Sequence, residues 1–599
     1  MQRRTLLQVL PAAAAALPDV ALGQSHPLLE EQAAQILAQA EKELATPASW
    51  EPLRAQRRRE LQAMLGLDPW PARTPLNVQV RGTLDRDDHT VEKLTFESIP
   101  KFYVTANLYL PKQRRGKLPA IVYVCGHAMV PEGAKTAYQR HGISFARNGY
   151  ACLIVDPIQI AEVFSLHHGV YAMQLYDWYA RGYTPAGIDV WNAIRAIDYL
   201  VSRPEVDAAK IGMTGRSGGA AMTWFTAALD ERIKVAAPVM GISTYLANLR
   251  EDTQKRHCDC MFPINFYRHD MTHQGGLIAP RPLLMAHGKK DDLFPVPGYT
   301  KFEEMMTKLY QGYGHPDRFR NIVVDTGHQD SDFLREQVLR WFDKHLVGMD
   351  REPETTYQNA KPAELTVFSG KPPADAINPR VHLLFKPIAK PQPNLLRTLK
   401  TQVFAHALTQ KGNPRTRVRV PQQEGRYPGF LYIAPIGEDP GLTGNFFRLG
   451  ALPSNVVQMT AQAFEWQPAE YRGLIRNAMH VGTTPETIRL QDVLAAVDEL
   501  LRHPKVDASK IVLAGRGIDA GIALYAAALD ERITDVLLIQ PPETHIRGPI
   551  FLNVLRHTDI AGTASALAPR KLHFFHYKPP VFQGPHMREI YSLAQPFTA

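Results

Sequence analysis

Short apolar runs separated by helical segments dominate the chain between residues 120 and 325. Near-continuous apolar strands of this kind are typical of a parallel sheet that is buried on both faces. After the second run, Val190, Ile194, Ile197 and Val201 recur at helical spacing and predict an amphipathic crossover helix. The predicted strands are 120–124, 151–155, 210–214, 235–239, 282–286 and 321–325. The pattern therefore predicts an α/β domain with a mostly parallel sheet.

The flanking regions carry different patterns. Helical periodicity after residue 26 predicts a helical segment within 24–75, and alternating residues over 78–111 predict antiparallel strands. These strands open a domain that we expect to span 76–348, closed by a helix over 333–346. Residues 349–392 are rich in proline and polar residues and predict a linker with one strand in it.

The chain then repeats itself at an offset of 300 residues. His503–Arg516 matches Arg203–Arg216, and Ala527–Ile533 is identical to Ala227–Ile233. Self-similarity at a constant offset indicates a duplicated fold. Residues 393–599 are therefore predicted to be a second copy of the first α/β domain.

Residues 1–23 have the features of an export signal. Arg3 and Arg4 precede a short apolar body that ends in small residues at Ala21 and Gly23. The arginine pair resembles a twin-arginine signal, although an ordinary secretory signal has the same start. We expect a periplasmic or secreted protein without stable membrane insertion, because no later segment has about 18 unbroken apolar residues.

The composition limits the kinds of binding partner that we expect. Charged residues make up 21% and hydrophobic residues 45% of the chain, as in globular proteins. The net charge is +9, but Lys and Arg are interleaved with Asp and Glu. No basic stripe is present, so a nucleic-acid partner is not expected.

The segment Gly215–Gly219 reads Gly-Arg-Ser-Gly-Gly and joins a predicted strand to a predicted helix. Such a turn is typical of a nucleophile elbow, in which glycines give room for a strained, exposed serine. Ser217 is the predicted nucleophile. The Gly218 amide at the helix N-terminus is a predicted oxyanion donor.

A serine needs a base and an orienting carboxylate, which in this type of fold follow it in the order Ser, Asp, His. Asp291 follows the strand 282–286, and His328 follows the strand 321–325 directly behind a glycine. Asp292 is an alternative acid. Asp156 precedes Ser217 in the chain, so we expect it to orient a loop.

The second oxyanion donor is expected from the loop after the strand 120–124, as the backbone of His127 or Ala128. Catalysis by the His127 side chain is a lesser alternative. Arg216, Arg181 and Trp178 are candidate substrate-binding residues, as are His167 and His168. Each has an alternative structural role, in a salt bridge beneath the elbow for Arg216 and in packing for the aromatic residues.

The segment His257-Cys-Asp-Cys260 raises the question of a metal. A single C-x-C with one histidine lacks the second ligand pair expected of zinc, so we expect a loop near the pocket, with or without a disulfide. No metal and no cofactor are predicted.

The second copy lacks the predicted chemistry. Gly517 stands at the position of Ser217 and Pro580 at that of Asp291, and the sequence ends before an equivalent of His328. We expect the C-terminal copy to act as a scaffold, a homodimer contact or a polymer-binding module.

With these residues in hand, the first half resembles the bacterial secreted acetyl xylan esterase-like α/β-hydrolases. The resemblance covers about residues 50–350. It rests on the elbow and on the segments Arg73–Asn77, Tyr103–Pro111, Arg181–Gly187, His257–Phe262 and Ala279–Leu284. It implies an α/β-hydrolase fold for this half and removal of acetyl or related acyl groups from plant polysaccharides. The chain departs from the family in carrying the repeat, from which we expect tandem α/β-hydrolase folds, the first active and the second degenerate. The alternatives are a prolyl-oligopeptidase-like serine peptidase and a non-catalytic carbohydrate-binding protein.

Overall fold

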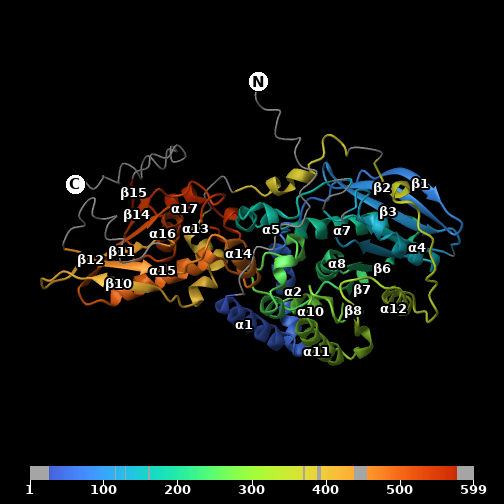
Figure 1. The fold of residues 1–599 in the computed structure, drawn as a ribbon, viewed down its shortest axis with the longest axis horizontal. Helices are drawn as coiled ribbons and strands as arrows, with labels where there is room; N and C mark the ends of the chain where they lie inside the picture. The colour runs from blue at the N-terminus through green and yellow to red at the C-terminus, as the bar shows by residue number, and fades with distance from the viewer. Residues whose placement is uncertain are drawn as a thin grey trace, which may run out of the picture.

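The protein consists of two α/β halves that lie side by side, each around its own sheet (Figure 1). The computed structural model describes residues 26–575 except 115, 129, 159–161, 163, 369–371, 388–392 and 438–454. The predicted export signal lies outside the described residues. Within the described chain, no helix combines the length and the apolar character needed to cross a membrane.

The first sheet has nine strands in the described part of the chain, in the order β1-β2-β3-β5-β4-β6-β7-β8-β9. Pairing is antiparallel from β1 to β5 and parallel from β5 to β9. The strands are β1 (Gln79–Asp85), β2 (His89–Ile99), β3 (Phe102–Pro111), β4 (Leu118–Val124), β5 (Ala151–Val155), β6 (Val206–Arg216), β7 (Ile233–Val239), β8 (Leu283–Gly288) and β9 (Phe319–Val324). The predicted strands and their mostly parallel arrangement are confirmed.

Helices cover both faces of this sheet. Along β4, Val122 and Val124 join one buried cluster and Ile121 and Tyr123 join the other, because successive side chains of a strand point to opposite faces. The first cluster includes residues of α7 (Pro185–Ser202), α8 (Gly218–Leu229), α10 (Thr272–Ile278) and α11 (Val296–Gly312). The second includes residues of α4 (Gln139–Arg147) and α12 (Asp332–Phe342). Helix α12 ends at Phe342, four residues before the predicted end at residue 346, and a π-helical turn, Asp343–Val347, follows it.

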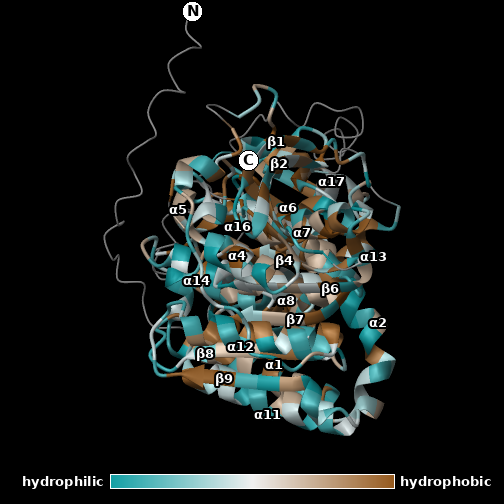
Figure 2. Ribbon diagram, turned by 90° about the vertical axis from the view of Figure 1, so that its right-hand side faces the viewer, coloured by the Kyte–Doolittle hydropathy of each residue, from teal (hydrophilic) through white to brown (hydrophobic). Residues whose placement is uncertain are grey.

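Two helices precede the first sheet, α1 (Pro27–Glu43) and α2 (Pro47–Met64). Thr46 begins α2 with a reciprocal cap, because its hydroxyl accepts from the Ser49 amide and the Ser49 side chain accepts from the Thr46 amide. The chain after α2 passes close to α7, where a Cβ at Gly187 would collide with the Leu65 carbonyl. Hydrophilic residues predominate on the visible sides of α2 and α11 at the rim of this half (Figure 2).

Residues 349–392 differ from the expected linker. Their described part contains the 3₁₀ helices Pro362–Leu365 and Asn378–Leu384 and no strand, so the strand prediction is wrong. Proline has no N–H to donate to the hydrogen-bond ladder of a sheet.

This segment packs on the first half. Leu365 is fully buried, and the Asn378 side chain pairs with the Tyr103 backbone at 2.9 and 3.0 Å.

The second sheet has six strands among the described residues, in the order β10-β12-β11-β13-β14-β15. One antiparallel pair, β10–β12, is followed by parallel pairs, as in β3-β5-β4-β6-β7-β8 of the first sheet. The strands are β10 (Arg415–Arg419), β11 (Tyr427–Ile433), β12 (Val457–Gln462), β13 (Val506–Arg516), β14 (Asp535–Ile539) and β15 (Lys571–Phe575). Helices α15 (Pro485–Arg502) and α16 (Ile518–Leu529) have the bounds of α7 and α8 shifted by 300 residues.

The halves meet through α14 (Tyr471–His480) of the second half. Its His480 ring stacks on Tyr245 at 5.1 Å between ring centres and lies 4.2 Å from the Phe262 ring. The Asn265 side chain donates to the His480 carbonyl at 2.7 Å. Because one continuous hydrophobic cluster contains residues of both halves, they form a packed unit.

Candidate active site

Ser217 lies at a strained turn between β6 and α8. Its backbone has φ 58° and ψ −121°, a conformation that L residues rarely adopt. Glycines on either side make the turn possible, since a Cβ at Gly215 or Gly219 would collide with the Val124 carbonyl. The local geometry is that of the predicted elbow, with the serine at the N-terminus of α8.

Asp291 and His328 meet across the ends of β8 and β9. His328 Nδ1 lies 2.8 Å from Asp291 Oδ2. The Asp291 side chain is 1% exposed and that of His328 20% exposed. The Leu293 amide donates to Asp291 Oδ1 at 2.9 Å, which holds the carboxylate in place. The His328 imidazole is thus partly exposed, while a buried acid orients its Nδ1.

The alternative acids are engaged elsewhere. Asp292 pairs with Arg256 at the surface. Asp156 accepts from Lys135 Nζ at 2.7 Å and from the Thr105 hydroxyl at 2.6 Å. The structure thus brings Asp291 to His328, and it places Asp156 in a buried ion pair, consistent with the expected role in orienting a loop.

Arg216 connects the elbow to the histidine loop. Its guanidinium donates to the His328 carbonyl at 3.3 Å and to the Tyr138 hydroxyl at 3.2 Å, and it lies 5.7 Å from the centre of the Tyr138 ring. These contacts tie the residue before Ser217 to the loop that carries His328, and they give Arg216 a structural role. The Ser217 hydroxyl makes no hydrogen bond within the described chain. Catalytic hydrogen bonds often form only once substrate binds.

The loop after β4 runs along the elbow, as expected of an oxyanion loop. A Cβ at Gly126 would lie 3.1 Å from the Ser217 Cβ, and a Cβ at Gly218 would lie 2.8 Å from the His127 ring. The Gly218 amide opens α8, where the first N–H groups have no intrahelical acceptor. Ala128 follows His127 on this loop. The predicted donors therefore lie around Ser217.

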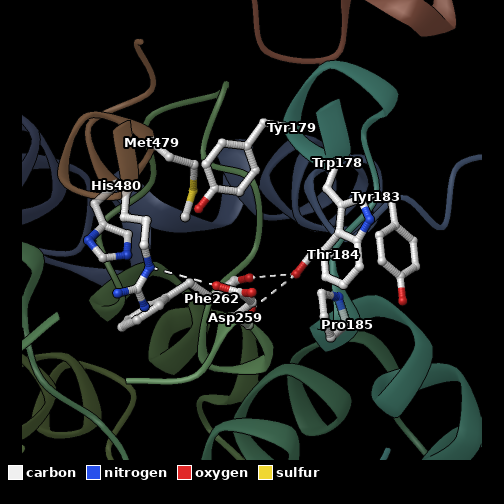
Figure 3. Close-up of a pocket in the computed structure, with 10 residues that line it drawn as sticks. Trp178, Tyr179, Tyr183, Thr184, Pro185, Asp259, Phe262, Met479 and His480 are labelled. Carbon is white, nitrogen blue, oxygen red and sulfur yellow. Dashed lines mark hydrogen bonds and ion pairs between the residues drawn. The ribbon is translucent and has the colours of Figure 1, made fainter. Parts of the chain in front are cut away.

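Trp178 and Arg181 are packed rather than open to a substrate. The Trp178 ring is 1% exposed and occupies the space beside Gly169, where any Cβ would collide with it. Arg181 pairs with Asp177 at 2.6 Å and donates to the Phe385 carbonyl at 2.9 Å. The cavity that Trp178 lines holds about 10 Å³, room for at most one water (Figure 3). We therefore correct both assignments to packing residues, because the cleft expected at this place is filled.

Figure 3 also shows how the second half reaches the first at this cavity, with Met479 and His480 facing Tyr179 and Phe262. Arg476, from the same helix, donates to the His257 carbonyl, and its Nε lies 3.7 Å from Asp259 Oδ1. Its guanidinium lies 4.8 Å from the Tyr171 ring centre. The turn 257–262 is therefore held by a helix of the second half.

One cluster of side chains was not expected from the sequence. Cys258 and Cys260 are free thiols, so they form no disulfide, and the His127 ring lies beside both. His167 and His168 approach Cys258 from another segment. The expectation of too few metal ligands considered only the local segment. The adjacent pair His167–His168 was the one sequence signal that pointed to further ligands.

The first half has an α/β-hydrolase fold, and the families that it matches are serine hydrolases of the esterase and prolyl oligopeptidase type. Residues 77–259 match the family model described as Acetyl xylan esterase (AXE1), and residues 176–348 match the Prolyl oligopeptidase family. Both matches end before the second half begins.

Similar proteins are found for the first half. The Bacillus subtilis (strain 168) protein named "Putative hydrolase YtaP" is 29% identical over 315 residues, which is 49% of this chain and 100% of the relative. A solved methylesterase is 22% identical, covering 59% of this chain and 78% of its own, with a TM-score of 0.44. A glucuronoyl esterase from Solibacter usitatus is 16% identical, covering 50% and 94%, with a TM-score of 0.38.

Proposed function

We propose that the protein is a serine carboxylic-ester hydrolase that uses Ser217, His328 and Asp291. The observation that carries the proposal is the Asp291–His328 hydrogen bond of 2.8 Å, on a loop that Arg216 of the elbow contacts. In this mechanism His328 takes the proton of the Ser217 hydroxyl as it attacks the ester carbonyl. The same proton then passes to the leaving alcohol, and water activated by His328 releases the acid from the acyl-enzyme.

The oxyanion of the tetrahedral intermediate would be stabilised by the Gly218 amide and by an amide of the loop at His127 and Ala128. Such preorganised donors are worth about 3 kcal/mol each in related chemistry. Asp291 orients the His328 ring and stabilises the imidazolium.

For the substrate we propose acetyl or related acyl esters of plant polysaccharides or their fragments. The support is the match of residues 77–259 to the acetyl xylan esterase model. We further propose that residues 1–23 direct export, since such substrates lie outside the cell.

The test is a substrate panel with the purified full chain. Wild type and Ser217→Ala are assayed on acetylated xylan, methylated pectin, glucuronoyl esters and 4-nitrophenyl acetate, with Ser202→Ala as a matched serine control. We expect turnover of at least one ester by wild type and the control, and its loss in Ser217→Ala. Turnover that persists in Ser217→Ala would refute the proposed nucleophile.

A serine peptidase is the second candidate, favoured by the match of residues 176–348 to the prolyl oligopeptidase family. Within the described residues before 349, the sheet carries only β1–β3 ahead of its parallel part, with no array of four-stranded blades. A parallel panel of prolyl amides decides between esterase and peptidase. Faster turnover of the amides than of the esters would favour the peptidase.

For the second half we propose a scaffolding role, with a homodimer contact as the alternative. The support is α14, whose Arg476 and His480 contact the turn 257–262 of the first half. Its sheet repeats the strand order of the first, which supports its origin as a degenerate copy. Light scattering of the full chain tests the homodimer.

A further inference from the structure

Five potential metal ligands from three distant segments converge beside the elbow. His127 comes from the loop after β4, His167 and His168 precede α5 (Gly169–Met173), and Cys258 and Cys260 flank the turn at Asp259. The ligand atoms of His127, Cys258 and Cys260 lie within 4.8 Å of one another, and so do those of His167, His168 and Cys258. Cys258 is shared by both groups.

Three nitrogen–sulfur distances in this cluster are close to the separation between ligands of a tetrahedral ion. His127 Nε2 lies 3.3 Å from Cys260 Sγ, and His127 Nδ1 lies 3.7 Å from Cys258 Sγ. His168 Nε2 lies 3.0 Å from Cys258 Sγ. Zinc with bonds of about 2.3 Å to sulfur and about 2.0 Å to nitrogen holds neighbouring S and N ligands about 3.5 Å apart. An imidazole gives one ion a single nitrogen, so His127 would bind through the nitrogen that lies within 4.8 Å of both sulfurs. The fourth ligand, His167 or His168, lies within 4.8 Å of Cys258 but not of all three other ligands, so it would have to move towards them.

A second observation points to a ligand. His167 is 5% exposed, and its Nε2 has no hydrogen-bond partner, which is costly for a buried polar atom. The His167 ring stacks against that of His127 at 4.9 Å. An ion bound through this atom would give His167 Nε2 the partner that it lacks.

We propose that His127, Cys258, Cys260 and one of His167 and His168 bind a zinc-class divalent cation. Thiolate sulfur and imidazole nitrogen select such ions, whereas magnesium and calcium require oxygen ligands. Four protein ligands close the coordination shell, which is typical of a structural site.

The ion positions the oxyanion loop; this role, unlike the binding itself, rests on the proposed function. The His127 ring lies against Gly218, so a metal bond to His127 fixes the loop 126–128 at the elbow. Cys258 and Cys260 lie on the neighbouring turn. Arg476 of the second half holds this turn by donating to the His257 carbonyl. The site thereby joins the elbow, the cysteine turn and α14.

The test measures metal content directly. The untagged full chain is purified under a phosphine reductant, loaded with Zn²⁺, dialysed and analysed by mass spectrometry of the metal. We expect about one zinc per chain in wild type and a loss of at least ~10-fold in Cys258→Ser and in Cys260→Ser. The matched control is Cys152→Ser, which changes a buried thiol in β5, and it retains the ion.

Cobalt substitution identifies the ligands. We expect thiolate-to-Co²⁺ charge-transfer absorption and visible bands of tetrahedral Co²⁺ in wild type, and their change in either His167→Gln or His168→Gln. Ser217→Ala keeps both the metal and the spectrum, so failure of the proposed nucleophile is distinguishable from failure of this site. A fully reduced wild type that retains no metal, or a cobalt spectrum without thiolate bands, overturns the proposal.

Discussion

Ser217 and Gly517 adopt the same backbone conformation in the two halves. Their φ and ψ are 58° and −121° for Ser217, and 58° and −123° for Gly517. Each amide donates to the end of the neighbouring strand, at Val239 in one half and at Ile539 in the other. Since the turn persists without the serine, the elbow is a property of the fold, and the chemistry depends on the side chain placed there.

Adding a serine to the second elbow is not expected to create a second site. A Cβ at Gly517 has open space around it, so Gly517→Ser fits apart from its positive φ. We predict that the double variant Ser217→Ala/Gly517→Ser is as inactive on esters as Ser217→Ala, because among the described residues no group outside the turn lies within 4 Å of a Cβ at position 517. Serine-probe labelling at residue 517 checks this, and labelling as fast as at Ser217 in wild type would contradict it.

Asp291→Asn is predicted to lower kcat by about 10⁴-fold with little change in KM, because the amide favours the wrong histidine tautomer. Steady-state kinetics on a small ester measures the effect. Asp292→Asn is the matched control, since Asp292 pairs with Arg256 at the surface. Equal losses in the two variants would show that Asp291 has no special role.

Glu486 links stability to pH. It is 1% exposed, and burial raises its pKa to about 7 against an ordinary 4.5, while the Tyr471 hydroxyl donates to it at 2.6 Å. A raised pKa means that the folded state binds more protons, so this contribution is complete below pH ~4.5 and is lost as the pH rises through about 7. The loss amounts to about 3 kcal/mol.

Glu486→Gln removes this dependence while keeping an acceptor for Tyr471. We predict that the variant unfolds at a higher temperature than wild type at pH 8, and that the difference narrows towards pH 5. Thermal melts across that range measure it, with Glu424→Gln at an exposed position as control. If the difference in melting temperature between Glu486→Gln and wild type grew as the pH fell, the predicted direction of the pKa shift would be wrong.

Arg476 is predicted to stabilise the contact between the halves. Replacing it by methionine leaves the Asp259 carboxylate and the His257 carbonyl buried without their cationic partner, which costs about 3 kcal/mol. The melting temperature of Arg476→Met should fall, whereas Arg472→Met, on the same helix, should change it little. Equal melting temperatures for the two variants would count against this contact.

Much of the site follows from local sequence. The elbow at Ser217 needs only a strand, small residues and a helix in succession, and these are encoded within about ten residues. The positions of Asp291 and His328 each follow a predicted strand, and parallel strands bring their carboxyl ends to one edge of a sheet. The repeat could also be recognised from the sequence, because identical residues recur at a constant offset of 300.

Only the tertiary structure decided which distant side chains share a space. Whether Trp178 faces a cleft or fills one depends on Gly169 and on the chain around Phe385, which no local pattern encodes. The grouping of His127 and His167 with Cys258 depends on three loops meeting above one sheet. Sequence by itself determined the elements and the order of the catalytic candidates, because these depend on neighbours along the chain. The fold decided packing and the cysteine cluster, because these depend on contacts between separate segments, such as that of His127 with Cys258 and Cys260, 131 and 133 residues away.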